Sequence, residues 1–243
     1  MASGGFGEAE RYSPYSTRRF ECIHRKINPY GKTKPKGRSG HCMSSDESDI
    51  YVFGGYSPVD ERNGVRQSRV LPELWRFNFA SQKWSIVEAD NTPDTCASSS
   101  IAVFNKKVFV FGGTGYPFGQ IMSNTIKTLN LKPTQRTGLS AAGETGECRA
   151  HIKQSWQLLE TNPMSYNVMG DVEDSTPPPA YGQSLIFHRD AVYVFGGAIG
   201  YYSEAVADLH KLNLESMSWE KQCPSGAIPS GRYKQEIIQD SER

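Results

Sequence analysis

The segment Ile50-Tyr-Val-Phe-Gly-Gly55 decides the fold of this chain, because it occurs three times in the sequence. The other copies are Val108-Phe-Val-Phe-Gly-Gly113 and Val192-Tyr-Val-Phe-Gly-Gly197. Each is an apolar run too short for a buried helix and rich in β-branched and aromatic residues. Each ends at glycines, which permit positive φ and close backbone approach. The three copies predict the same central strand in three repeated sheets.

Alternating segments on both sides of each glycine pair predict further strands. Sixteen residues before the first glycine lie Arg38, Cys96 and Ala180, each opening a polar-apolar stretch. We call this place in the repeat the opening position. Stretches with a period of two follow the glycines at 73–79, 125–131 and 208–214 and predict a third strand. A tryptophan then follows after five residues in the first and last copies and after twenty-five in the middle copy, which therefore contains an insertion.

These repeats predict an all-β chain of four-stranded units, each about 50 residues long, and they resemble the kelch-repeat β-propeller family. We predict blades at 38–92, 93–176 with an insertion at about 132–155, and 177–228, then the start of a fourth at 229–243. Residues 1–37 are predicted to be a basic, mostly disordered leader. The signature residues of the repeat are Gly54, Gly55, Trp84, Gly112, Gly113, Trp156, Gly196, Gly197 and Trp219. Three blades and one strand predict a partial, open propeller, consistent with a fragment, a short isoform or an incomplete gene model.

The amino-acid composition indicates which kind of binding partner and which cellular compartment to expect. The 27 lysine and arginine residues against 26 acidic residues give a net charge of +1, which argues against a nucleic-acid binder. The five cysteines are scattered and never form a C-x-x-C pair, which is typical of a reducing compartment. No run approaches the roughly 20 apolar residues of a membrane span. We expect a soluble cytoplasmic or nuclear protein whose partner is a protein or peptide.

No motif of the common enzyme classes is present, so we expect a binding protein without catalytic residues or cofactor. Glu204, Asp208 and His210 lie close together and are of metal-ligand type. His210, however, takes the repeat position of Trp75 and Lys127, so we predict no metal site there. A copper oxidase on a kelch propeller is the least favoured alternative, because the histidines lack ligand spacing.

Strand direction predicts where a partner would bind. In an antiparallel blade, the opening position shares one rim with the loop after the glycine pair. These loops are rich in tyrosine, which supplies rigid contact area, and arginine can bind a carboxylate through two nitrogens. The candidate peptide-binding residues are Arg38, Tyr56, Tyr116, Tyr181, Tyr201, Tyr202 and Arg232. Two alternatives stay open: the tyrosines pack against a neighbouring blade, or the arginines brace turns through backbone carbonyls.

Several segments resemble kelch propellers that act as substrate receptors of cullin-2 ubiquitin ligases. They are Phe111-Gly-Gly-Thr-Gly-Tyr-Pro-Phe-Gly119, Glu73-Leu-Trp-Arg76, Tyr181-Gly-Gln183, Asp208-Leu-His-Lys-Leu212 and Arg232-Tyr-Lys-Gln-Glu236. The resemblance implies a six-bladed propeller that binds protein C-termini ending in glycine. It also implies a C-terminal segment that docks elongin B and C, which we expect to be absent from this chain. The alternative is a kelch scaffold of cytoskeletal or signalling assemblies without a ligase role.

Overall fold

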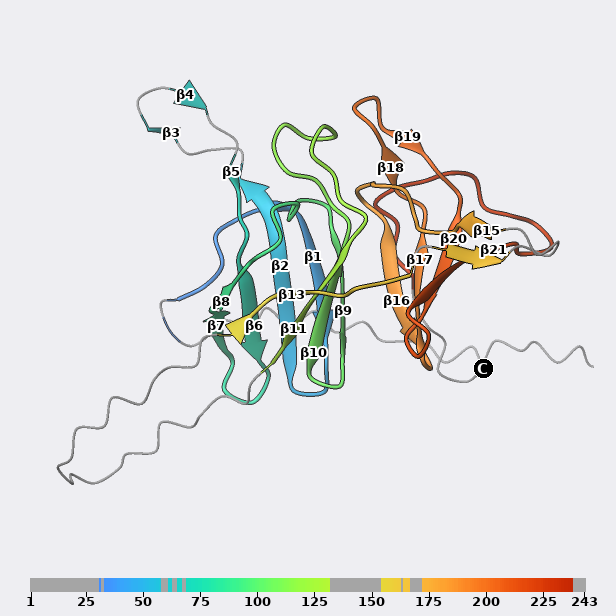
Figure 1. Ribbon diagram of the computed structural model, residues 1–243. Helices are drawn as coiled ribbons and strands as arrows, with labels where there is room; N and C mark the ends of the chain where they lie inside the picture. Colours follow the sequence, from blue (N-terminus) through green and yellow to red (C-terminus); the bar gives the residue numbers. More distant parts are fainter. Residues whose placement is uncertain are drawn as a thin grey trace, which may run out of the picture.

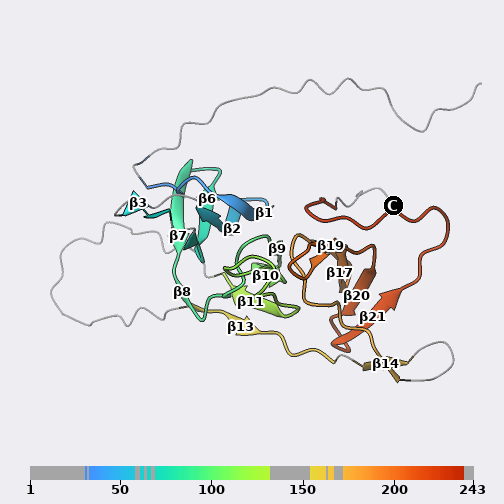
Figure 2. The same ribbon diagram turned by 90° about the horizontal axis from the view of Figure 1, so that it is seen from above.

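The computed structural model describes residues 31, 33–57, 61–62, 65–66, 69–131, 154–162, 164–166 and 172–237 (Figure 1). All of the regular structure in these ranges is β, which confirms the predicted fold class. The described part of the chain contains no helix suited to spanning a lipid bilayer. Three four-stranded antiparallel arrangements, here called blades 1 to 3, follow one another along an arc when seen from above (Figure 2). The described residues contain no fourth blade.

Each blade has the same strand order, with the glycine-ended segment as its second strand. Blade 1 consists of β1 (Ser39–Ser45), β2 (Asp49–Ser57), β6 (Leu74–Asn78) and β7 (Lys83–Val87), with β5 (Arg69–Val70) beside the end of β2. Blade 2 consists of β9 (Ser100–Phe104), β10 (Lys107–Phe111), β11 (Ile126–Asn130) and β13 (Gln157–Leu158). Blade 3 consists of β16 (Ser184–His188), β17 (Ala191–Phe195), β20 (Leu209–Asn213) and β21 (Ser218–Gln222).

Short strand pairs connect and decorate the blades. They are β3 (Glu61–Arg62) with β4 (Val65–Arg66), β8 (Ala89–Asp90) with β12 (Gln154–Ser155), β14 (Met164–Tyr166) with β15 (Val172–Asp174), and β18 (Ala198–Ile199) with β19 (Glu204–Ala205). The β8–β12 pair is parallel and leads directly into Trp156, which is buried. The predicted loop at 132–155 therefore ends two residues early, because burial of this tryptophan holds the residues before it against blade 1. The rest of that loop lies outside the described residues.

The two predicted ends of the chain are described only in part. Residues 1–30 and 32 of the predicted leader lie outside the described residues, as do 238–243 of the predicted fourth blade. Residues 229–237 form no strand. They are attached to blade 3 by main-chain hydrogen bonds, in which the amides of Gly197 and Lys234 donate to the carbonyls of Arg232 (2.9 Å) and Gly182 (2.7 Å).

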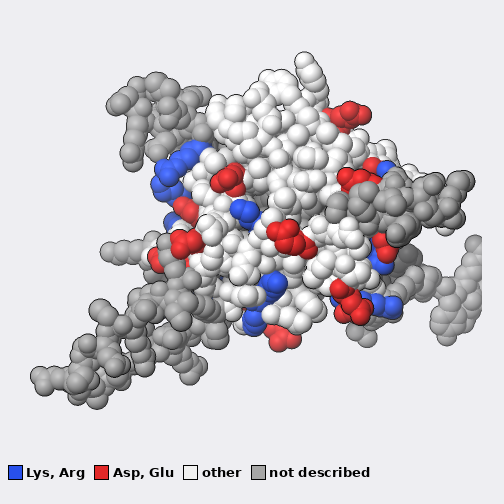
Figure 3. Space-filling view, viewed as in Figure 1, with Lys and Arg blue, Asp and Glu red and all other residues white. Residues whose placement is uncertain are grey.

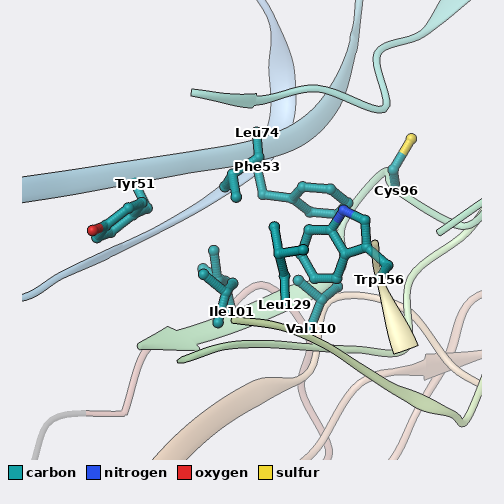
Figure 4. Packing of buried hydrophobic residues seen from close by; sticks show 9 residues of the cluster. Tyr51, Phe53, Leu74, Cys96, Ile101, Val110, Leu129 and Trp156 are labelled. Atoms are coloured by element: carbon teal, nitrogen blue, oxygen red, sulfur yellow. The ribbon is translucent and has the colours of Figure 1, made fainter. Parts of the chain in front are cut away.

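The hydrophobic core lies between blades. Figure 4 shows Phe53 and Leu74 of blade 1 facing Val110, Leu129 and Trp156 of blade 2, all of them buried. An equivalent cluster joins blades 2 and 3 and consists of Phe109, Phe111, Ile126, Val192, Val194, Leu212 and Trp219. Burying one aliphatic or phenyl side chain contributes roughly 1.5–3 kcal/mol, so the contacts between blades supply much of the stability.

The glycine pairs are required by the close approach of the next blade. Gly54 has φ +69°, and a Cβ built on it would lie 1.9 Å from the carbonyl oxygen of Cys96. The amide of Gly55 donates to that oxygen at 2.8 Å, and the amide of Gly113 donates to Ala180 at 3.0 Å. Any side chain at the first position would push the neighbouring blade away, which explains why the sequence repeats glycine there.

Candidate functional site

A cavity of about 550 Å³ lies where the opening segments of the three blades converge. It is lined by residues 39–43 and Tyr56 of blade 1, 98–101 of blade 2, 182–185 of blade 3, and 234–236. We call it the axial cavity. Its lining comes from corresponding places in each repeat, because the first strand of every blade is the innermost one. The same repeats that build the fold therefore also build the site.

Main-chain hydrogen bonds link the four segments that line the axial cavity near their opening positions, and we call this part of the cavity its mouth. Ser98 donates to Gly40 (2.7 Å), Gly182 donates to Ser98 (2.6 Å), and Lys234 donates to Gly182 (2.7 Å). These four residues all lie two places after the opening position of their repeat. Three of them are glycine or serine, which leaves space at the mouth, and the hydrogen bonds hold its backbone in one arrangement.

Deeper in the cavity, side chains repeat the same pattern of links. The hydroxyl of Ser100 donates to the carbonyl of Gln183 and that of Ser184 to the carbonyl of Gln235, both at 2.5 Å. Cys42 stands at the corresponding place in blade 1, with its sulfur 3.6 Å from the hydroxyl of Ser99. Burial raises the pKa of the Cys42 thiol to about 12, so it stays protonated and unreactive at neutral pH. The hydroxyls of Ser100 and Ser184 thus link neighbouring segments and fix the lining in one arrangement.

Two of the predicted tyrosines form an aromatic row that leads outward from the cavity. Tyr56 lines the cavity, and its ring centroid lies 4.7 Å from that of Phe118. Phe118 in turn contacts Tyr116 at 5.5 Å, and Tyr116 is 55% exposed. Tyr56 packs on a loop of the next blade and also lines the cavity. It therefore fits both predictions made for the tyrosines, namely peptide binding and packing against a neighbouring blade.

The other predicted tyrosines lie on blade 3. The hydroxyl of Tyr181 is hydrogen-bonded to that of Ser203, and its ring packs 6.1 Å from Tyr233. Tyr201 and Tyr202 lie at the tip of the β18–β19 hairpin and are 65% and 95% exposed. This hairpin contacts the neighbouring loop, because a Cβ built on Gly119 would lie 3.1 Å from the Cα of Tyr201. Figure 3 shows that the top of the molecule, where these loops lie, is largely uncharged.

The two predicted arginines have different surroundings. The side chain of Arg38 is 3% exposed, and its guanidinium donates to the carbonyl of Gly54 (3.0 Å) and to the carboxylate of Glu73 (2.7 Å). Burial raises the pKa of Glu73, but hydrogen bonds from Trp75 and Arg38 outweigh it and keep this pKa below its usual value. Arg38 thus makes the bracing contacts of the second alternative. The side chain of Arg232 is exposed, and its hydrogen bonds are local, to Ser230.

The residues considered for metal binding do not converge. His210 is buried, and its Nδ1 lies 2.9 Å from the carbonyl oxygen of Ser175. Asp208 forms an ion pair with Lys221 at 3.0 Å, and Glu204 lies in the exposed hairpin. In the ranges that the structure describes, no three histidine, cysteine or acidic side chains form a group able to hold a metal ion.

The structure adds cavity residues that the sequence interpretation did not single out. His41, Lys234 and Glu236 line the cavity and supply its basic and acidic side chains. Gln183 also lines it and packs against the glycine pairs of two blades, since a Cβ on Gly197 would lie 2.6 Å from its Cγ. The signal was present in the repeat: His41 and Gln183 both lie three places after the opening position.

Three antiparallel blades joined through glycine pairs around a common cavity define a β-propeller of the kelch type. The sequence profile of the KLHDC2/KLHL20/DRC7 Kelch-repeats domain matches residues 20–239, and the chain belongs to this kelch-repeat family.

Among its relatives is kelch domain-containing protein 10. The rat protein is 33% identical over 221 residues, covering 88% of this chain and 46% of its own length. The human protein is 32% identical, with 88% of this chain and 42% of its own length covered. The chain thus spans less than half the length of these curated relatives. The solved structure of YjhT superposes with a TM-score of 0.52 at 14% identity, covering 81% of this chain and 54% of that one, which shows the fold alone.

Proposed function

We propose that this kelch propeller binds the C-terminal segment of partner proteins at the axial cavity and its tyrosine rim. The observation that carries the proposal is the cavity itself, a preformed space of about 550 Å³ with a hydrogen-bonded mouth and aromatic side chains beside it. Sites of this volume are typical for small ligands and peptide ends. A peptide bound there would meet rigid surfaces, so little conformational entropy would be lost.

The charges near the mouth support recognition of a carboxylate. Lys234 lines the cavity, with its Nζ 5.7 Å from the centroid of the Tyr233 ring, and the exposed Arg232 lies two residues before it. Arg38 is engaged by Glu73 and does not serve this role in our proposal. Lys234 and Arg232 would therefore hold the terminal carboxylate, while glycine and serine at the mouth would let the last residues of the peptide approach the backbone closely.

At the level of the cell, we propose that the chain is the substrate-recognition part of a cullin-2 and elongin B/C ubiquitin ligase that recognises C-terminal glycine. This proposal rests on the resemblance of its repeat segments to such receptors. Docking to elongin would require a segment outside the three blades.

Peptide binding can be tested by fluorescence anisotropy with the intact chain. Peptides ending in glycine are compared with the same peptides amidated or extended by one residue. We expect the free carboxylate to bind at least tenfold more tightly, and Lys234→Gln to lose about that factor, since a charge-assisted hydrogen bond is removed. Lys221→Gln, which removes a lysine paired with Asp208 outside the cavity lining, serves as the matched control. Equal binding of all three peptides would defeat the proposal.

A second candidate is a scaffold that binds a folded protein on the propeller surface without any ligase. The exposed pair Tyr201 and Tyr202 favours it, because aromatic side chains on a protruding hairpin suit a broad interface. Co-purification from cells separates the two candidates. Recovery of cullin-2 and elongins B and C supports the ligase, whereas a stable partner in their absence, lost in Tyr202→Ala, supports the scaffold.

A further inference from the structure

Two loops of neighbouring blades touch beside the axial cavity and share one outer surface. One is the blade 2 loop at 114–122, and the other is the β18–β19 hairpin of blade 3. A Cβ built on Gly119 of the loop would lie 3.0 Å from the carbonyl oxygen of Gly200 in the hairpin, so their backbones are in contact. We call this shared surface the aromatic crest. Its exposed side chains are Tyr116, Ile121, Tyr201 and Tyr202.

Hydrogen bonds hold the backbone beneath the crest in both blades. In blade 2, the buried hydroxyl of Thr114 donates to the carbonyl of Ile121 (2.9 Å) and accepts from the amide of Gly119 (3.0 Å). In blade 3, the amides of Tyr181 and Ala198 donate to each other's carbonyls at 3.1 Å and 2.9 Å, which anchors the base of the hairpin. The exposed rings are therefore carried by a fixed backbone, and binding to them has little ordering cost.

The crest contains no charged side chain. Residues 112–123 and 196–203 include no aspartate, glutamate, lysine or arginine, and Figure 3 shows this top side largely uncharged. Exposed aromatic side chains gathered on one surface favour an interaction site. A charged side chain placed on this surface would lose hydration without gaining a partner, so the crest fits an uncharged apolar segment.

The crest is continuous with the axial cavity through the aromatic row. Tyr56 lines the cavity, Phe118 packs on it, and Tyr116 extends the row outward, with 4.7 Å and 5.5 Å between successive ring centroids. About three residues of extended chain span these two steps. A peptide whose last two residues occupy the cavity therefore meets the crest with the residues just before them.

We propose that the aromatic crest binds the third to fifth residues from the end of the C-terminal segment held in the axial cavity, and that it selects uncharged apolar side chains there. The inference rests on the proposed function and adds a second determinant of specificity to it. Lys234 would hold the carboxylate, while the rings of Tyr116 and Tyr201 would pack on the upstream side chains. Tyrosine suits this role because its ring supplies a large contact area at a low cost in conformational entropy.

Fluorescence anisotropy with the intact chain tests the inference. Three peptides share a terminal glycine and differ only at the third to fifth residues from the end, which are all leucine, all serine, or Glu-Ser-Lys with no net charge. We expect the leucine peptide to bind at least about tenfold more tightly than the other two, because only its side chains gain from burial. Tyr116→Ser combined with Tyr201→Ser should reduce this preference to about threefold or less and leave the affinity of the serine peptide unchanged.

Phe104→Ser is the matched control, because Phe104 is an exposed aromatic residue at the far end of β9 from the cavity. It should leave the preference for leucine intact, and circular dichroism verifies that every variant is folded. Equal binding of the three peptides, with dependence on the free carboxylate retained, would overturn the inference and leave the proposed function standing. A preference that survives Tyr116→Ser with Tyr201→Ser would also overturn it. If amidated peptides bind as tightly as free ones, the proposed function and the inference both fail.

Discussion

The indole of Trp219 packs on the ring of Phe111 with 5.8 Å between ring centroids, which joins the last strand of blade 3 to the second strand of blade 2. Both side chains are at most 1% exposed. A residue at the outer edge of one blade is therefore in the core of the contact with its neighbour, and stability depends on contacts between repeats.

The first prediction concerns this tryptophan. Trp219→Ala should lower the free energy of unfolding by about 3–5 kcal/mol, because it leaves a large cavity between two blades. Urea unfolding, followed by circular dichroism, measures the loss. Trp84→Ala removes the same residue type at the same repeat position on a partly exposed face, and should cost less than half as much. Equal losses would contradict the role assigned to the contacts between blades.

The second prediction concerns the glycine pair of blade 2. Gly113 has φ +89°, and a Cβ on it would meet the carbonyl oxygen of Thr95 at 2.3 Å. Gly113→Ala should cost at least about 2 kcal/mol of unfolding free energy, since it adds a backbone clash to conformational strain. Gly226 has the same φ of +89° with nothing within 4 Å, so Gly226→Ala measures the strain alone. Thermal unfolding of both variants is the measurement. If the midpoint fell by a similar amount in both, close packing would not be the reason why glycine is needed at position 113.

The third prediction separates the two arginines. Arg38→Met should destabilise the chain by about 1–3 kcal/mol, because the carboxylate of Glu73 and the carbonyl of Gly54 lose a buried donor. Arg232→Met should change stability by less than about 0.5 kcal/mol, since its side chain is exposed. Chemical denaturation of both variants is the measurement. Peptide affinity should fall more in Arg232→Met than in Arg38→Met. A stability loss confined to Arg232→Met would refute the structural role assigned to Arg38.

The fourth prediction is a dependence of stability on acid. Burial raises the pKa of Asp46, but hydrogen bonds from Lys106 and Ser48 lower it to about 2 from a usual 3.8. Because the folded-state pKa is the lower one, this carboxylate stabilises the fold above about pH 4. That contribution is lost as the pH falls toward 2. It is at most about 2 kcal/mol, since Lys106 is largely exposed.

Asp46→Asn tests this assignment. The stability difference between the native chain and the variant should be largest near neutral pH and should shrink between pH 4 and pH 2. Ser216→Ala is a neutral control in an exposed turn, and its difference from the native chain should stay constant across the same range. A constant difference for Asp46→Asn as well would show that the carboxylate charge contributes nothing.

The fold could be predicted because its determinants are local. Alternating apolar residues specify strands, and glycine pairs mark close backbone approach. Because both features recur at the same spacing, the pattern predicted three β units with the correct second and third strands. The insertion was harder, because the pairing of β12 with β8 depends on Trp156 reaching blade 1 across a long separation in sequence.

The candidate site was less predictable. Tyr56 does lie on the axial cavity, but Arg38 is withdrawn into an ion pair with Glu73, and Lys234 and His41 were not anticipated. Repeat position locates a residue on a rim, yet whether its side chain faces the cavity depends on partners contributed by other strands.

Periodicity and glycine placement alone specify the repeating sheet, its strand order and the rim on which its loops lie, because these follow from near-neighbour sterics and strand alternation. Tertiary structure decides which side chains are bound by neighbours and which face the axial cavity. The physical reason is that hydrogen bonds and aromatic contacts between blades join residues far apart in sequence, and their geometry exists only once the blades have packed together.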